Sequence, residues 1–245
     1  MRMLFRTLAF ITVASLLSFS QTTPATKPPV RTPAAAPSSD PTAIIHTTAG
    51  DMRCRLFEKL APIGVANFIG LAEGTKDWTN PVSHAKKHGV PLYDGTIFHR
   101  VIPEFMIQGG DPAGNGAGDP GYKFKNETPE DLKFDRPGRL AYANSGPDTN
   151  GSQFFITEDV GHSAHLTGHY TIFGQCDVAS VELVKKIARM TRDPNNDRPF
   201  RPVKITHIEI QRGGAAAPKA APAKPASTTK PSAAVKKQAP PQSQQ

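Results

Sequence analysis

FHRVIPEFMIQGGD, residues 98–111, is the stretch of sequence that most constrains the fold of this chain. It holds two short apolar runs of strand character, separated by a proline turn and ended by two glycines. Two related segments follow, AYANSGPDTNGSQFFIT at 141–157 and HLTGHYTIFG at 165–174. Short strands divided by Gly, Pro and Asn turns are typical of an antiparallel β-barrel that closes on itself.

The flanking sequence extends this pattern to about eight strands and two helices. The first helix runs from Pro62 to its stop at Gly74, and the second spans about 177–189. The segment from Gly74 to Pro91 is polar and predicts a surface insertion. We therefore expect a mainly β fold, a closed antiparallel barrel with two capping helices. The expected strands are 42–48, 51–57, 95–101, 105–110, 138–143, 152–157, 170–175 and 202–211.

Composition limits the folded part to residues 42–213. Residues 21–41 and 214–245 hold 12 of the 24 prolines and almost no large apolar side chains. Such segments bury too little surface to offset the entropy lost on ordering. The sequence predicts one domain between a disordered linker and a disordered tail.

Residues 42–213 contain 20 basic and 20 acidic residues, so the net charge of +8 lies outside them: +2 in residues 1–20, +1 in 21–41 and +5 in 214–245. A basic chain raises the question of nucleic-acid binding. No aromatic side chain accompanies the lysines of the tail to stack on bases, so we exclude nucleic acid as a partner.

Residues 1–20 have the pattern of a secretory signal peptide. Arg2 and Arg6 precede an apolar run at 8–19 that ends in small residues, and cleavage after Ser20 leaves Gln21 first. No cysteine follows the run, so the sequence does not support a lipid anchor. The interpretation places the protein in the periplasm or outside the cell, without a stable membrane span. The alternative is an uncleaved anchor helix.

The two cysteines, Cys54 and Cys176, allow two interpretations. In an oxidising compartment they form one disulfide, and two buried free thiols fit the sequence equally well. Neither lies in a CxxC motif or beside a histidine, so neither is predicted to be catalytic.

The three segments quoted above resemble the cyclophilin family of peptidyl-prolyl cis/trans isomerases. The first two match the family signature almost residue for residue, and the order and spacing of all three agree. The resemblance covers about residues 43–211. It implies catalysis of rotation about X-Pro bonds. With the signal-like amino terminus, the expected substrates are folding or unfolded exported proteins, and we expect a monomer without cofactor or metal.

This reaction needs a fixed cation and a dry pocket. Rotation faces a barrier of ~18–20 kcal/mol, because the amide loses its partial double bond at the 90° twist. A cation beside the imide nitrogen, which regains a lone pair there, stabilises that state. By resemblance Arg100 supplies it, with Phe105 and Gln108 in the catalytic set. Strand alternation predicts that His99 points away and is structural.

The same resemblance implies the substrate-binding residues. Phe105 and Met106, with Phe155 and Leu166, form the proline pocket. Since Phe105 and Met106 are consecutive, a local irregularity must turn both toward the ligand. The groove for the residues before proline is assigned to Ala143, Asn144, Ser145 and Gln153, with Asn144 pairing main chain to main chain.

Two positions depart from the better-known members of the family. His165 stands where many carry tryptophan, and Tyr170 stands where they carry histidine. Both are assigned to the substrate groove. Tyr170 keeps a ring and a hydroxyl, so activity is expected, whereas sensitivity to the family's cyclic-peptide inhibitor is in doubt.

The sequence allows three competing interpretations. The string GNGAGDPG at 114–121 imitates a dinucleotide-binding motif but opens no predicted helix, so it reads as a loop at the rim of the groove. His162, His165 and His169 have a spacing that zinc ligands use. The remaining rival is a chaperone or scaffold that binds proline segments with little turnover, and the presence of Arg100 argues for the enzyme.

Overall fold

The structure of the protein, a computed structural model, describes residues 40–213. The predicted signal peptide, nearly all of the predicted linker and the tail from residue 214 lie outside the described residues.

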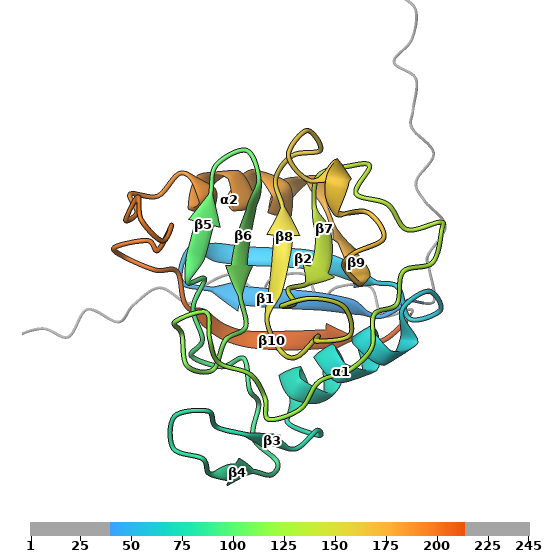
Figure 1. The fold of residues 1–245 in the computed structure, drawn as a ribbon, viewed down its shortest axis with the longest axis vertical. Coiled ribbons are helices and arrows are strands. Elements are labelled where there is room, and N and C mark those ends of the chain that lie inside the picture. Colours follow the sequence, from blue (N-terminus) through green and yellow to red (C-terminus); the bar gives the residue numbers. More distant parts are fainter. Residues whose placement is uncertain (1–39, 214–245) are drawn as a thin grey trace, which may run out of the picture. The chain divides into compact units, whose positions relative to one another are not determined.

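Eight strands form one curled antiparallel sheet, which confirms the predicted mainly β fold. Their order across the sheet is β10-β1-β2-β9-β7-β8-β6-β5. Figure 1 shows β5, β6, β8 and β7 crossing in front of β1, β2 and β10. Their bounds are β1 Thr42–Thr47, β2 Gly50–Leu56, β5 Arg100–Ile102, β6 Met106–Gly109, β7 Arg139–Tyr142, β8 Phe154–Thr157, β9 Ile172–Cys176 and β10 Ile205–Gln211.

The edges of this sheet meet through irregular pairing just outside the strands. The edge strands are β10 and β5. Phe98 N–H donates to Val203 O at 3.0 Å, and Ile205 N–H donates to Thr96 O at 2.8 Å. The residues that precede β5 therefore lie against the beginning of β10, and these bonds satisfy main-chain groups that an open edge would expose.

Two helices are present, as predicted: α1 (Pro62–Glu73) and α2 (Val178–Ala188). They lie at opposite ends of the barrel (Figure 1). Pro62 occupies the first turn of α1, and Gly74 ends it with a left-handed φ of 73°. The Asp177 carboxylate caps α2 by accepting from Ser180 N–H at 2.8 Å. Within residues 40–213, neither helix has the length and apolar character that crossing a bilayer requires.

The polar segment after α1 differs from the expected plain loop. It contains a two-stranded hairpin of β3 (Trp78–Thr79) and β4 (Lys86–Lys87). Trp78 is buried, and its Nε1–H donates to Val90 O at 2.9 Å. A single buried indole therefore anchors an otherwise polar insertion, which composition alone did not indicate.

Side-chain alternation along the strands divides the apolar residues into two clusters. On β8, Phe154 and Ile156 face the main core, whereas Phe155 between them belongs to a second, smaller cluster. On β6, Ile107 faces the core and Met106 faces the second cluster. Since successive side chains of a strand point to opposite faces, the second cluster lies on the outer face of the sheet. The functional site is built on that cluster.

The two cysteines form a disulfide, which decides between the alternatives left open by the sequence. Cys54 on β2 lies directly opposite Cys176 on β9, and both are buried. The bond joins positions 122 residues apart in the sequence. Closing so long a loop stabilises the folded state by restricting the unfolded chain, typically by about 2–5 kcal/mol.

Candidate active site

A cavity of about 540 Å³ opens on the outer face of β5, β6 and β8. Nine of the twelve residues assigned from the sequence line it: Arg100, Phe105, Met106, Gln108, Ala143, Asn144, Phe155, Leu166 and Tyr170. The other three line neighbouring hollows: Ser145 and Gln153 one of about 220 Å³, and His165, again with Ser145, one of about 670 Å³. The motifs thus located the cavity, and His165 lies in a neighbouring hollow.

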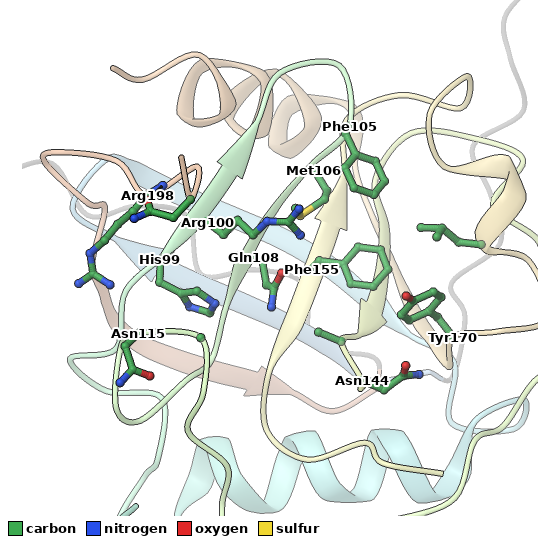
Figure 2. Close-up of a pocket in the computed structure, with 14 residues that line it drawn as sticks. His99, Arg100, Phe105, Met106, Gln108, Asn115, Asn144, Phe155, Tyr170 and Arg198 are labelled. Carbon is green, nitrogen blue, oxygen red and sulfur yellow. Dashed lines mark hydrogen bonds between the residues drawn. The ribbon is translucent and has the colours of Figure 1, made fainter. Parts of the chain in front are cut away.

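One side of the cavity is apolar, and we call it the apolar wall: Phe105, Met106, Ala143, Phe155 and Leu166. Phe155 stacks on Phe134 with ring centroids 5.8 Å apart, and Tyr170 meets it edge-on at 5.6 Å. Figure 2 shows Phe105, Phe155 and Tyr170 together on this side. Packing behind and beside Phe155 holds its ring in place before any ligand binds.

A turn explains how the consecutive residues Phe105 and Met106 both line the apolar wall. Phe105 precedes β6 and belongs to a turn in which Glu104 has a φ of 63°. Glu104 N–H donates to the Glu158 carboxylate at 3.0 Å, and Glu158 N–H donates to Phe105 O at 2.8 Å. These bonds fix a backbone region that non-glycine residues rarely adopt. The expected irregularity is therefore this turn.

The opposite side, the polar wall, consists of His99, Arg100, Gln108, Asn115, Asn196 and Arg198. Arg100 lies across from Gln108, and His99 N–H also donates to Gln108 O at 3.0 Å. Two consecutive residues therefore oppose one, which is the arrangement of a β-bulge. The prediction that His99 points away from Arg100 is wrong, because the bulge interrupts the alternation on which it relied.

Arg100 extends its guanidinium across the floor of the cavity, toward Phe155 (Figure 2). Its Nε lies 3.7 Å from Oδ2 of Asp197, and its side chain is 42% exposed. The cation is thus partly desolvated and lies beside the apolar wall. A charge in such a position interacts more strongly with a ligand dipole than it does in bulk water.

His99 is 5% exposed, and neither of its ring nitrogens has a hydrogen-bond partner within residues 40–213. Burial lowers the pKa of His99, an effect that the nearby Asp111 carboxylate opposes. Arg198 and Arg100 lower it further. A neutral imidazole therefore stands next to Arg100 near neutral pH.

Gln108 and Gln153 connect the strands to a glycine-rich rim. Gln108 Nε2–H donates to Gln153 Oε1 at 3.0 Å, and Gln153 Nε2–H donates to the carbonyls of Gly116 and Gly118 at 3.0 and 2.8 Å. The buried Asp111 carboxylate accepts from the rim at Ala113, Asn115 and Gly116 N–H. The side-chain partner of Gln108 is therefore Gln153, whereas Asp197 is the ion-pair partner of Arg100.

Asn144 lies at the far end of the cavity from Arg198 (Figure 2). Its side chain is used internally, since Nδ2–H donates to His169 O at 3.2 Å and Oδ1 accepts from Gly146 N–H at 3.3 Å. Ser145 N–H donates to Thr149 Oγ1 at 2.9 Å. The side chain of Asn144 is therefore held by the neighbouring residues His169 and Gly146.

The sequence did not reveal the contribution of the loop 191–200, which brings Asn196 and Arg198 to the polar wall. Its sequence, TRDPNNDRPF, consists of turn-forming and charged residues typical of any surface loop. Its alignment with β5 is a long-range contact, shown by the bond from Val101 N–H to Asp197 O at 2.9 Å. No local signal marks such a contact.

The geometry bears on the zinc and the dinucleotide interpretations. Within residues 40–213, no three His, Cys, Asp or Glu side chains converge to hold a metal, and His162 instead lies 3.8 Å from Asp159. Residues 114–121 form a rim of turns without a helix and line both the main cavity and its 220 Å³ neighbour.

The site is therefore a cavity on the outer face of a β-barrel, with an apolar wall and Arg100 beside it. The family described as "Cyclophilin type peptidyl-prolyl cis-trans isomerase/CLD" matches residues 42–210. Peptidyl-prolyl cis-trans isomerase A of Mycobacterium tuberculosis is 51% identical over 176 residues, 71% of this chain and 94% of that protein. Peptidyl-prolyl cis-trans isomerase B of Streptomyces anulatus is 48% identical over 170 residues, 69% of this chain and 95% of that protein.

The fold has a matching neighbour among solved structures. The crystal structure of a cyclophilin type peptidyl-prolyl cis-trans isomerase from Cryptosporidium parvum aligns with a TM-score of 0.57 and 33% identity, covering 70% of this chain and 97% of that chain. A second structure of that protein was determined in the presence of the dipeptide Ala-Pro, with a TM-score of 0.56 and 32% identity over 69% and 98% of the two chains. The chain belongs to the cyclophilin family, and it is a peptidyl-prolyl cis-trans isomerase.

Proposed function

We propose that the chain accelerates X-Pro rotation in exported proteins and that Arg100 stabilises the twisted amide. The observation that carries the proposal is a guanidinium that lies in the cavity beside the apolar wall. At the 90° twist the imide nitrogen regains its lone pair and becomes a better hydrogen-bond acceptor than in the planar amide. A fixed cation there binds the transition state more tightly than either ground state, which is what catalysis requires.

The apolar wall provides the complementary half of the mechanism. Phe105, Met106, Phe155 and Leu166 form an apolar surface that suits the proline ring. Burying the ring holds the proline still while the preceding residue rotates. The same wall excludes water, which strengthens the interaction between Arg100 and the imide nitrogen.

The groove on the other side of the site accounts for a broad substrate range. Asn144 pairs its main chain with the residue before proline, while Ala143, Ser145 and Gln153 border the hollow beyond it. Main-chain pairing gives affinity without reading side chains. The substrates we propose are therefore unfolded or folding polypeptides of varied sequence.

We further propose that the protein is exported to the periplasm or beyond the cell and works there as a monomer. The signal-like residues 1–20 and the Cys54–Cys176 disulfide support this location, since disulfides persist in oxidising compartments. Fractionation of cells followed by amino-terminal sequencing is expected to find the mature protein outside the cytoplasm, beginning at Gln21. A cytoplasmic protein that begins at Met1 and carries two free thiols contradicts the proposal.

The rival function is binding of proline segments as a chaperone with little turnover. The two differ in the amount of protein needed, because uncatalysed proline isomerisation takes about 10–100 s at 25 °C. Catalytic amounts are expected to accelerate a proline-limited refolding reaction. Suppression of aggregation at stoichiometric amounts, without acceleration, favours the chaperone.

Arg100→Ala tests the mechanism directly. Loss of a charge that acts in the transition state is expected to lower kcat/KM on a proline tetrapeptide by about 100- to 1,000-fold. Arg100→Lys keeps the charge but not the planar fork, and an intermediate loss is expected. Full activity of Arg100→Ala, in a protein whose thermal unfolding is unchanged, refutes the assigned role.

A further inference from the structure

The loop 191–200 is attached to β5 at the residue after Arg100. Val101 N–H donates to Asp197 O at 2.9 Å, and Asp197 N–H donates to Asp193 O at 2.9 Å. Asp197 has a φ of 58°, in the left-handed region that Asp and Asn tolerate better than most residues. Both main-chain groups of Asp197 are thus bonded, which fixes its Cα beside the strand that carries the arginine.

The carboxylate of Asp197 is held between two cations. Its Oδ1 accepts from Arg192 Nε–H at 3.1 Å, and its Oδ2 lies 3.7 Å from Arg100 Nε. The Asp197 side chain is 27% exposed and that of Arg192 is 31% exposed. Since Arg192 holds one oxygen, the second oxygen keeps a defined direction toward Arg100.

We propose that Asp197 is a positioning residue for the isomerase reaction, acting through Arg100. By engaging Nε it directs the two terminal nitrogens of the guanidinium into the cavity, toward the place of the imide nitrogen. This inference rests on the role proposed above for Arg100. The sequence did not single out Asp197, and its carboxylate is not part of the cavity lining.

An ordinary surface ion pair is the competing explanation, and such pairs contribute about 0–1 kcal/mol to stability. Two observations set this pair apart. Asp197 is anchored through its main chain to β5 itself, and its other oxygen is already held by Arg192. The geometry therefore fixes the direction of the Arg100 side chain. We expect loss of the Asp197 carboxylate to lower turnover more than it lowers stability.

Asp197→Asn is the suitable variant because asparagine tolerates the same left-handed backbone and removes only the charge. We expect kcat on a proline tetrapeptide to fall about tenfold with KM changed less than twofold, because misdirected catalytic groups lose rate more than binding. Asp197→Glu tests whether a carboxylate on a longer side chain restores part of the rate. Asp94→Asn is the matched control, since Asp94 pairs with His207 at 3.2 Å, and neither residue lines the cavity.

A double-mutant cycle separates positioning from structural support. In the Arg100→Ala background, Asp197→Asn is expected to change kcat/KM by less than about 1.5-fold, because its effect passes through the missing arginine. An equal loss in both backgrounds overturns the proposal, as does a single variant that stays within twofold of the parent. If Arg100→Ala alone keeps full activity, the role of Arg100 fails as well, so the two failures are distinguishable.

Discussion

The two walls of the cavity are built differently. In the apolar wall, regular alternation brings Met106 on β6 and Phe155 on β8 to the outer face, and the neighbouring segments add Phe105, Ala143 and Leu166. The polar wall comes from a bulge at His99 and Arg100 and from two loops, one held by Asp111 and the other by Asp197. A regular sheet provides a binding surface, whereas placing a charge on that surface requires interruptions of regular structure. The first wall is thus suited to binding and the second to catalysis.

Removing an aromatic ring from the apolar wall is expected to have the largest effect on peptide binding. Phe105→Ala deletes a half-buried ring, so kcat/KM falls by about 10- to 100-fold with an increase in KM, while most stability remains. Steady-state kinetics on a proline tetrapeptide with a parallel thermal melt measures both. Phe200→Ala removes a ring that is 66% exposed and outside the cavity lining, and it serves as the control. An unchanged KM in Phe105→Ala contradicts the division of labour between the walls.

Loosening the glycine-rich rim is expected to lower activity less than removing the Phe105 ring. Gln153→Ala deletes the amide that bonds Gln108, Gly116 and Gly118, and kcat/KM is expected to fall by about 3- to 10-fold. Hydrogen exchange of residues 112–120 should quicken in parallel. Gln175→Ala is the matched control, since its amide donates to Pro137 O and Cys176 O away from the cavity. Equal losses in both variants show that the rim has no special role.

Acidification is expected to weaken the polar wall through His99. Burial lowers the pKa of His99 in the folded protein, so the unfolded chain takes up its proton first as the pH falls below about 6.5. The free energy of unfolding therefore decreases in that range. Urea titrations at pH 7.5 and 5.5 should show a smaller decrease for His99→Gln than for the parent. Identical decreases mean that His99 does not titrate as proposed.

Deleting residues 214–245 is expected to have the smallest effect. The segment follows the predicted domain and has the composition of a solvated arm, so kcat/KM on short peptides should stay within about 1.5-fold. The same tetrapeptide assay on the truncated chain tests this. A large loss means that the domain edge was placed too early.

Local sequence was sufficient for the strands, and the residues of the apolar wall were assigned through the resemblance of their motifs to the cyclophilin family. Phe105, Met106, Phe155 and Leu166 lie in long motifs, and the flanking turns contain the expected Gly, Pro and Asn residues. Arg100 was found in the same way. Each of these residues is placed by its own strand, the adjoining turn or, for Leu166, a single helical turn, so nearby residues determine its position.

The remaining residues depend on contacts between distant segments. The orientation of His99 was not predicted, because strand alternation does not reveal a bulge. The contribution of Asn196 and Arg198 was not predicted, because their loop is placed by β5, about 100 residues earlier in the chain. The burial of Trp78 was not predicted, because one buried indole in a polar segment leaves no periodic pattern. The polar wall was therefore the part of the site that sequence reasoning recovered least.

The pairing of the first and last strands has a consequence for engineering. Thr42 lies opposite Gln211, so the first and last residues of the barrel domain are neighbours. Arg212 fixes the carboxyl-terminal residues through hydrogen bonds of 2.6 and 2.7 Å to the Glu73 carboxylate. A circularly permuted chain that links these ends and opens at the exposed Val82 retains the pairings of all eight barrel strands. New termini can thus be chosen at that hairpin for display or fusion while the site stays whole.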